Sequence, residues 1–525
     1  MKDKIKEYFN LINIAAISIV LPVIVFLFGF IKFYIALPVS LVFLFTLFKF
    51  IKNNKNIEEC SLGKKSWIYI IISLIIVFLW ILLSGIGGFS YQNDGSLEYL
   101  YVSRFEKGNY VAYDWDVRNA VFKDLVNESW PLKVHLQDQA IMDFIKIGPD
   151  YAFSYYYTYW LIPALVGKIF GIGVANLFLL LYSFILVFLT ISLLNKKLKG
   201  NIVITTIIFI LFSGMDILLF RKQFPDILFK FNHIEKAITY LQYSSNTTLL
   251  YWVFNQSIMT WLVMAVLINL EDLKSILFIS ALTFAYSPFA TLGLVPIVAV
   301  LMIKNYIDKE EVEKFNKEEF FKFIKQFISI ETLCAIFLLI IYGTYYTASD
   351  TAIAAKGWTW DISKMSFLEF IKLYVEFIVV EVLVYFILLV RRNKKDPLFW
   401  VVIAELVVFP FYVVTYSNDL MMRGSIPALF ILCYFVIKYM LESDKVKVII
   451  PMLIVLIVGS ITPIHEISRS VFATMVLHRR EPINPYIESV VCPKTMEGTK
   501  ICYDQFYVSV YNNKFFFKYL SKDIK

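Results

Sequence analysis

The chain has 525 residues, of which 59% are hydrophobic and only 18% are charged. That share of charge excludes a water-soluble globule of this size, because a soluble protein covers its surface with polar and charged side chains. The net charge of +8 does not indicate nucleic-acid binding, since the lysines and arginines lie between apolar segments rather than in one patch. The apolar segments are about 20 residues long, as in helices that cross a bilayer, and lack the alternation of a β-barrel. We therefore predict an all-α membrane protein.

In chain order, we predict about thirteen transmembrane helices in a polytopic domain of residues 1–462. Their approximate ranges are 11–31, 33–51, 67–88, 174–194, 201–220, 248–269, 275–287, 288–304, 327–347, 369–391, 398–416, 426–441 and 446–462. The first apolar segment lacks a small-residue cleavage site, so we expect it to remain as a span. The two helices near 275–304 are short, and we expect Pro288 and Pro296 to break them into a kinked hairpin.

The positions of lysine and arginine predict the orientation in the membrane. With a cytoplasmic N-terminus, the basic clusters between spans all fall on the cytoplasmic side, as the positive-inside rule requires. They include Lys4, Lys6, Lys49, Lys196, Lys197, Lys304, Arg391, Arg392, Lys438 and Lys447. The segment 309–326 alternates charged and apolar residues and is predicted to be an amphipathic helix on the cytoplasmic surface. We expect a multi-pass protein of the plasma membrane with a small exterior tail at 463–525.

The apolar segment 151–170 is interpreted differently from the spans. If it crossed the membrane, the basic residues Lys196 and Lys197 would lie outside the cell. We therefore predict a helix that lies along the outer surface. Its cluster of aromatic residues between Tyr155 and Trp160 is typical of the headgroup level. The alternative is an ordinary span with an aromatic belt.

The exterior loop 89–173, which includes this surface helix, is the predicted seat of the chemistry. Long loops in compact proteins often carry function, and this one is rich in aspartate. A carboxylate at the edge of the membrane can act as a general base for a hydroxyl or amine acceptor. The candidate bases are Asp114 and Asp116, in the densest acidic stretch, and Asp94, just beyond the third span.

Each candidate base also has a structural interpretation. Asp114 can cap a helix whose apolar face is Val117, Val121, Phe122 and Leu125. Asp94 can be a turn residue, because it lies in an Asn-Asp-Gly sequence. Asp116 can pair with Arg118 or Lys123 on a solvated face.

Two further exterior segments carry arginine. Arg423 starts a predicted span, where a guanidinium group needs an anion; that anion is either a lipid phosphate or the nearby Asp419. His465 and Arg469 are four residues apart and therefore share one helical face. They can hold a phosphate together, or Arg469 can simply pair with Glu466.

The spans themselves contain a few polar residues, which are costly in lipid and often functional. They are Asn255, Gln256, Glu376, Glu381 and Glu405. The three glutamates can form a proton or ion path, or they can lie near the interfaces. With only 4 histidines, 5 cysteines and no CxxC pattern, no cofactor or metal site is predicted. Carboxylates alone can nevertheless hold a divalent cation. Cys492 and Cys502 can pair in an oxidising compartment or remain free.

Several short motifs carry a resemblance to known proteins. They are Asp114-Trp115, Asn119-Ala120, Asp124-Leu125, Ser129-Trp130-Pro131, residues 159–171, Ser287-Pro288-Phe289-Ala290, Gly293-Leu294-Val295-Pro296, Asn418-Asp419, Met422-Arg423, residues 425–429, and Glu466 with Arg469. In these motifs the chain is similar, along nearly its whole length, to a group of poorly characterised prokaryotic multispan proteins. The order of a span, an acidic exterior loop, a surface helix and many further spans resembles the layout of GT-C-type glycosyltransferases.

The resemblance implies a GT-C-like fold and a membrane glycosyltransferase of the non-cytoplasmic face. Such an enzyme moves a sugar from a polyprenyl-phosphate-linked donor to a glycan, lipid or protein acceptor. The catalytic role falls on Asp114, with Asp116 as its partner. The chain departs from the family layout by two extra spans before the loop. The stretch from Asp94 to Tyr113 also separates Asp114 from the third span, which leaves Asp94 as a rival.

The proposed substrate contacts lie on several segments of the chain. Arg423, helped by His465 and Arg469, is expected to stabilise the charge on the leaving phosphate. Asp419, which precedes Arg423 by four residues, is a candidate substrate contact. Arg118 and Gln256 are further candidate contacts. Two other functions remain open: a transporter or flippase for a glycolipid or anionic solute, and a polysaccharide polymerase.

Overall fold

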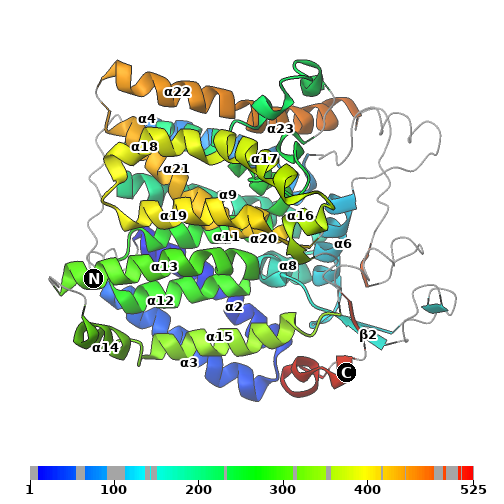
Figure 1. The fold of residues 1–525 in the computed structure, drawn as a ribbon. Coiled ribbons are helices and arrows are strands. Elements are labelled where there is room, and N and C mark those ends of the chain that lie inside the picture. Colours follow the sequence, from blue (N-terminus) through cyan, green and yellow to red (C-terminus); the bar gives the residue numbers. More distant parts are fainter. Residues whose placement is uncertain are drawn as a thin grey trace.

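The computed structural model of the chain describes residues 10–54, 66–90, 113–135, 142–143, 150–229, 233–310, 316–350, 356–415, 418–443, 445–477, 489–491, 507–509 and 511–523. Within these ranges the protein is a bundle of helices that run side by side, so that their ends gather on two opposite faces (Figure 1).

In the part of the chain that the structure describes, eight helical segments are long and apolar enough to cross a membrane. They are Leu11–Phe30 (α2), Phe33–Asn53 (α3), Ile172–Leu198 (α9), Ile202–Phe220 (α10 and the 3-10 helix η3), Asn246–Leu267 (α11), Pro288–Lys309 (α13), Phe367–Asn393 (α17, the π-helix η7 and α18) and Val446–Met475 (α22, α23 and most of η9). Five other predicted spans are shorter helices: Ser66–Leu82 (α4), Leu273–Leu282 (α12), Ile330–Tyr346 (α15), Pro397–Val408 (α19) and Ile426–Leu441 (α21). The chain is therefore an all-α, multi-pass membrane protein, in which eight of the described helical segments meet the length criterion for a crossing.

Helix α11 is the centre of the bundle. Every one of its residues is buried, and it packs against α2, α9 and α21. It begins after Ser245, whose side chain accepts a hydrogen bond from the backbone N–H of Thr248. The backbone departs from helical geometry at Val253 (φ −139°, ψ 32°), so the helix is kinked near its first turns.

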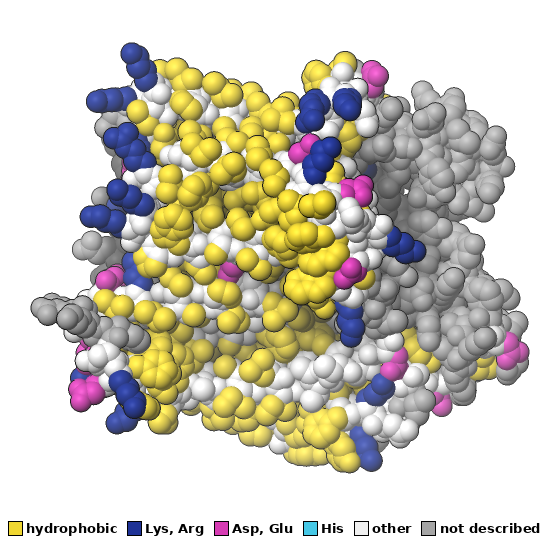
Figure 2. Space-filling model, viewed as in Figure 1, with side chains coloured by type: hydrophobic (Ala, Val, Ile, Leu, Met, Phe, Trp, Pro, Cys, Tyr) yellow, Lys and Arg dark blue, Asp and Glu magenta, His cyan; other side chains and the backbone are white. Residues whose placement is uncertain are grey.

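The outward faces of the peripheral helices are apolar. On α3, for example, the side chains of Phe33 and Phe48 are each 63% exposed. Hydrophobic side chains cover the middle of the bundle, while lysines and arginines gather toward the helix ends (Figure 2). This is the surface that a helical protein presents to lipid.

The predicted hairpin near 275–304 is wrong in its second half. Pro288 does not break a helix, because it occupies the first position of α13, where its missing N–H is not needed. Ser287 caps this helix, and Pro296 lies inside it without ending it. Pro288 therefore starts a full-length helix, and Pro296 does not interrupt it.

The single surface helix predicted at 151–170 is also wrong in its first half. The chain forms strand β2 (Asp150–Phe153), the 3-10 helix η2 (Tyr157–Trp160) and only then α8 (Leu161–Phe170). Tyr157, Tyr159 and Trp160 are at most 1% exposed, so they pack in the protein core rather than on a lipid-facing surface. The sequence favoured a headgroup belt because buried and interfacial aromatic clusters have the same composition.

The loop and the tail meet at one face of the bundle. Strands β1 (Lys133–His135), β2 and β5 (Tyr507–Ser509) form an antiparallel sheet in the order β1-β2-β5, with Lys133 opposite Ala152 and Ala152 opposite Val508. The tail continues through η10 (Tyr511–Asn513) and η11 (Phe516–Leu520) to an isolated bridge between Ile31 and Ser521. The tail therefore pairs with the loop at one point and with the turn between α2 and α3 at another.

The other predicted boundaries shift. The last predicted span, 446–462, continues through α23 (Ile461–Phe472) to Met475, beyond the predicted start of the tail at 463. The amphipathic segment predicted at 309–326 forms a shorter helix, α14 (Lys317–Lys325), because α13 already extends to Lys309. Cys334 and Cys433 are free and buried, whereas Cys492 and Cys502 lie outside the described residues.

Candidate functional site

Helix α6 (Tyr113–Asn127) carries two of the predicted catalytic residues. Asp114 and Asp116 lie in its first turn, and their side chains are outside the described part of the chain, as is the whole of Asp94. The helix already includes Tyr113, so its capping position precedes Asp114. The predicted apolar face is confirmed, because the following side chains are all buried: Val117, Val121, Phe122 and Leu125.

The start of α6 rests on the kinked part of α11. The ring of Trp115 stacks on that of Phe254, with the centroids 5.6 Å apart. The guanidinium group of Arg118 lies over the Trp115 ring, 5.5 Å from its centroid, a cation–π arrangement. These contacts hold the first turn of α6, which includes Asp114 and Asp116, beside the kink of the central helix.

Asp124 anchors the other end of α6. Its buried carboxylate accepts hydrogen bonds from the Ser489 hydroxyl at 2.8 Å and from the backbone N–H groups of Val490 and Val491 at 2.6 and 3.0 Å. Burial raises its pKa, opposed by these hydrogen bonds. Asp124 therefore ties the tail to the loop rather than facing a substrate.

The second predicted segment forms the short helix α20 (Asp419–Gly424). The Arg423 guanidinium pairs with the Asp419 carboxylate at 3.2 Å, and each side chain is 16% exposed. The structural interpretation of this pair is therefore confirmed, while a role in phosphate binding stays a prediction. Tyr156 lies close to this pair: burial raises the pKa of its phenol, and the Arg423 charge opposes that rise.

Tight backbone packing holds α20 in place. A Cβ atom added to Gly293 of α13 would lie 1.9 Å from the carbonyl oxygen of Gly424. Only glycine at position 293 allows α13 and α20 to approach this closely. This contact positions the helix that carries Asp419 and Arg423.

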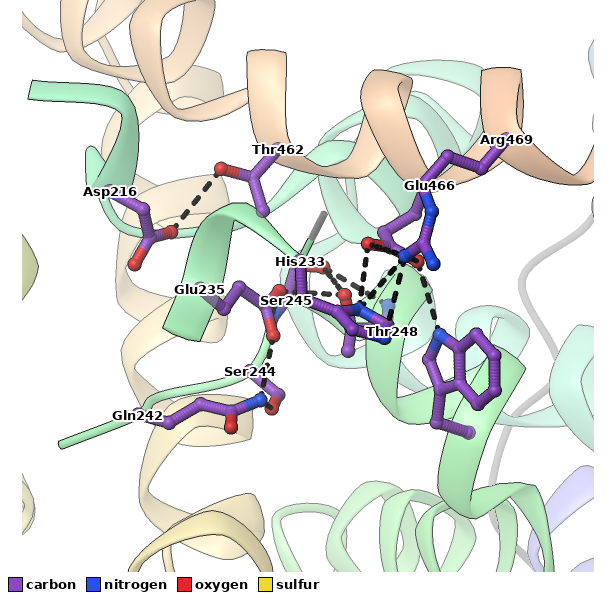
Figure 3. A network of polar contacts seen from close by, with 11 residues as sticks. Asp216, His233, Glu235, Gln242, Ser244, Ser245, Thr248, Thr462, Glu466 and Arg469 are labelled. Carbon is purple, nitrogen blue, oxygen red and sulfur yellow. Dashed lines mark hydrogen bonds and ion pairs between the residues drawn. The ribbon is translucent and has the colours of Figure 1, made fainter. Parts of the chain in front are cut away.

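The third predicted segment lies on α23 and forms a buried ion pair. Arg469 is 1% exposed and donates to both carboxylate oxygens of Glu466, at 2.8 and 3.0 Å. Trp252 of α11 donates its indole N–H to Glu466 at 3.1 Å, and the ring nitrogen Nδ1 of His233 lies 2.9 Å from Arg469 (Figure 3). The interpretation that Arg469 pairs with Glu466 is therefore confirmed, and the guanidinium group is committed to a protein carboxylate.

The neighbouring histidines differ from the prediction. His465, predicted to share a phosphate with Arg469, is 7% exposed and buried in the protein. His233 instead approaches both Glu466, at 3.1 Å, and Arg469. Burial lowers the pKa of His233, although the Glu466 charge opposes this. No sequence pattern indicated His233 or Trp252, because both reach the pair from elements that are more than 200 residues away.

A second buried carboxylate lies beside this ion pair (Figure 3). Glu235 is 2% exposed and accepts hydrogen bonds from the Ser245 N–H at 2.8 Å, the Thr248 hydroxyl at 2.7 Å and the Gln242 amide at 3.2 Å. It therefore ties the segment before α11 to the cap of that helix. Burial, and then the charge of Asp216, raises its pKa to about 8.

This raised pKa predicts a pH-dependent stability. Between the ordinary value of 4.5 and about 8, unfolding releases the Glu235 proton, so the free energy of unfolding is expected to fall as pH rises through this window. Glu235→Gln is expected to remove that part of the fall, on the order of a few kcal/mol. Thermal unfolding of both proteins in detergent at several pH values measures the difference. Parallel curves for the two proteins would contradict it.

Asp216 lies at the start of η3, where α10 (Ile202–Leu211) has unwound. Its carboxylate accepts from the hydroxyl groups of Ser213 and Thr462, each at 3.3 Å. Glu381 of the π-helix η7 (Val379–Leu383) lies next to this break: a Cβ atom on Gly214 would be 2.0 Å from its carboxylate. Two buried acidic side chains thus face one break in a membrane helix.

The other polar residues predicted within spans separate into three environments. Gln256 is 1% exposed and accepts a hydrogen bond from the Ser287 hydroxyl at 2.8 Å, which ties α11 to the start of α13. Glu405 is buried and makes no ion pair within the described residues. Glu376 lines a surface pocket beside α17. The predicted substrate contact at Gln256 thus has a structural role.

Within the described ranges, no group of three or more His, Cys, Asp or Glu side chains is arranged to hold a metal ion. No protein-family model, curated protein or solved structure matches this chain.

Proposed function

We propose that this chain is a membrane glycosyltransferase of GT-C type, which transfers a sugar from a polyprenyl-phosphate-linked donor to an acceptor on the non-cytoplasmic face. The observation that carries the proposal is the place of α6. Its first turn, with Asp114 and Asp116, is held by Trp115 on the kink of the central helix α11. Figure 1 shows α20, with Arg423, at the same end of the bundle.

The proposal includes a topology of thirteen crossings with a cytoplasmic N-terminus, in the plasma membrane. It is supported by the eight long helices together with the five shorter apolar ones, and by the basic helix ends. Basic residues lie in the last turns of α9 and α18, as at Lys197 and Arg391, whereas α6 lies at the opposite ends of the helices.

In this mechanism a carboxylate of α6 takes the proton of the acceptor hydroxyl as the hydroxyl attacks the sugar. The glycosidic bond to the carrier phosphate breaks, and negative charge builds on that phosphate. Arg423 would stabilise this charge by leaving Asp419 for the phosphate, since the pair is partly exposed. Arg469 does not stabilise this charge, because its guanidinium group is already paired with Glu466.

The test is sugar transfer in membranes that contain Asp114→Asn, Asp116→Asn or Asp94→Asn protein, with a labelled polyprenyl-phosphate sugar as donor. Loss of the base is expected to lower the rate at least about 100-fold. Glu128→Gln, which removes an exposed carboxylate just beyond the other end of α6, is the control. Full activity in all three aspartate variants would overturn the assignment of the base.

A second candidate, a transporter or flippase for a glycolipid or anionic solute, is favoured by one observation. Glu381 and Asp216 are buried beside the unwound end of α10, and broken membrane helices with acidic residues are typical of transport sites. Transport in reconstituted vesicles that survives Asp114→Asn but is lost in Glu381→Gln would favour this function over the transferase.

A further inference from the structure

A charged pocket lies on the lipid-facing side of α17, apart from the residues of the proposed active site. It has a volume of about 410 Å³ and lies between the exposed face of α17 and the segment that follows α10. Its charged side chains are Arg221, Lys222, Lys372, Glu369 and Glu376. Within the described residues none of these five side chains makes an ion pair, so the pocket keeps three positive and two negative groups for a ligand.

The polarity of α17 changes along the face that forms the pocket. Glu369, Lys372 and Glu376 follow one another on α17 at helical spacing. The π-helix η7, which continues α17, then presents an exposed apolar stripe formed by Val379 and Leu383, each 38% exposed. Figure 2 shows charged side chains of both signs where the apolar surface near α17 ends. The face is charged at the end of the span and apolar toward its middle.

We propose that this pocket binds the headgroup of an anionic phosphodiester lipid from the surrounding leaflet, one that carries hydroxyl groups beside its phosphate. Arg221, Lys222 and Lys372 donate to the phosphate oxygens, for which guanidinium and ammonium groups are suited. Glu369 and Glu376 accept hydrogen bonds from the headgroup hydroxyls. The acyl chains lie along the exposed apolar stripe of η7.

The polarity of the whole site argues for a lipid rather than a free phosphate. A free phosphate would use the three cations but would meet two carboxylates and leave the exposed stripe below the pocket uncovered. A phosphodiester with hydroxyl groups satisfies both signs of charge, and its chains cover Val379 and Leu383. The inference does not depend on the proposed function, because the pocket shares no residue with the proposed active site.

The experiment titrates the purified full-length protein in mild detergent with phosphatidylglycerol and measures the bound lipid by native mass spectrometry. The triple variant Arg221→Gln, Lys222→Gln, Lys372→Gln is expected to bind at least about tenfold more weakly than the wild type, because charge-assisted hydrogen bonds are lost. The matched control neutralises three exposed lysines outside the pocket: Lys236, Lys356 and Lys364. The control is expected to bind like the wild type.

A second variant is expected to change the lipid affinity in the opposite direction. Its result does not depend on whether the first variant folds. Glu369→Gln with Glu376→Gln removes the repulsion on the phosphate while the amide oxygens still accept from hydroxyls, so affinity is expected to rise. Equal losses in the pocket triple and its control, or no rise in the glutamine variant, would overturn the proposal. Competition by glycerol phosphate as effective as that by the lipid would identify a soluble-phosphate site and would overturn it too.

Discussion

Replacing Arg469 with methionine is expected to lower the free energy of unfolding by about 3–5 kcal/mol, the cost of leaving a buried charge without its partner. Glu466 is 1% exposed, and its remaining hydrogen-bond partners among the described residues would be the Trp252 indole and the His233 ring. The ionised Glu466 carboxylate would then be buried without the opposite charge of Arg469. Chemical or thermal unfolding of the purified protein in detergent measures the change.

A double-mutant cycle measures the interaction between Arg469 and Glu466 separately from their other contacts. Glu466→Gln alone is expected to lower the free energy of unfolding by a comparable amount, because it leaves the buried Arg469 charge without its partner. The double variant is expected to be more stable than the sum of the two single changes predicts. Strictly additive effects of the two changes would contradict the buried ion pair. Arg423→Met serves as the comparison, because the Arg423 and Asp419 side chains are each 16% exposed. We expect this change to alter the free energy of unfolding only slightly but to cause a large loss of sugar transfer.

Much of the fold could be predicted from sequence because hydrophobic length reports directly on helices in lipid. Each of the thirteen predicted spans corresponds to an apolar helix, whereas length and composition alone qualify eight as crossings. The errors arose where one residue type has two uses. Pro288 starts a helix as readily as it ends one, and aromatic residues such as Trp160 serve the core as well as the headgroup level.

The candidate site was harder to predict, because its contacts join distant segments. The local pairs Asp419–Arg423 and Glu466–Arg469 were recognised as alternatives, since partners three or four residues apart share a helical face. His233 and Trp252 lie far from α23 in sequence, and no local spacing indicates that they contact its Glu466. Buried polar networks of this kind depend on tertiary packing that single-sequence patterns do not encode.

Gly293→Ala is expected to lower both stability and activity, because the added Cβ would lie 1.9 Å from the carbonyl oxygen of Gly424. Backbone atoms cannot turn aside as a side chain can, so α13 and α20 must separate. Overpacking of this kind costs about 1–3 kcal/mol, and a contact with backbone falls toward the upper end. The unfolding midpoint and the rate of sugar transfer are measured on the same preparation.

The control is Gly343→Ala in α15, where an added Cβ meets nothing within 4 Å. This change is expected to be neutral or to stabilise the protein by up to about 1 kcal/mol, because alanine has a higher helix propensity than glycine. If Gly293→Ala behaves like this control, the close contact between α13 and α20 is wrong. If stability falls while transfer is unchanged, the position of α20 does not govern the reaction. Arg423 could then no longer be placed at the leaving phosphate, because its helix would tolerate displacement.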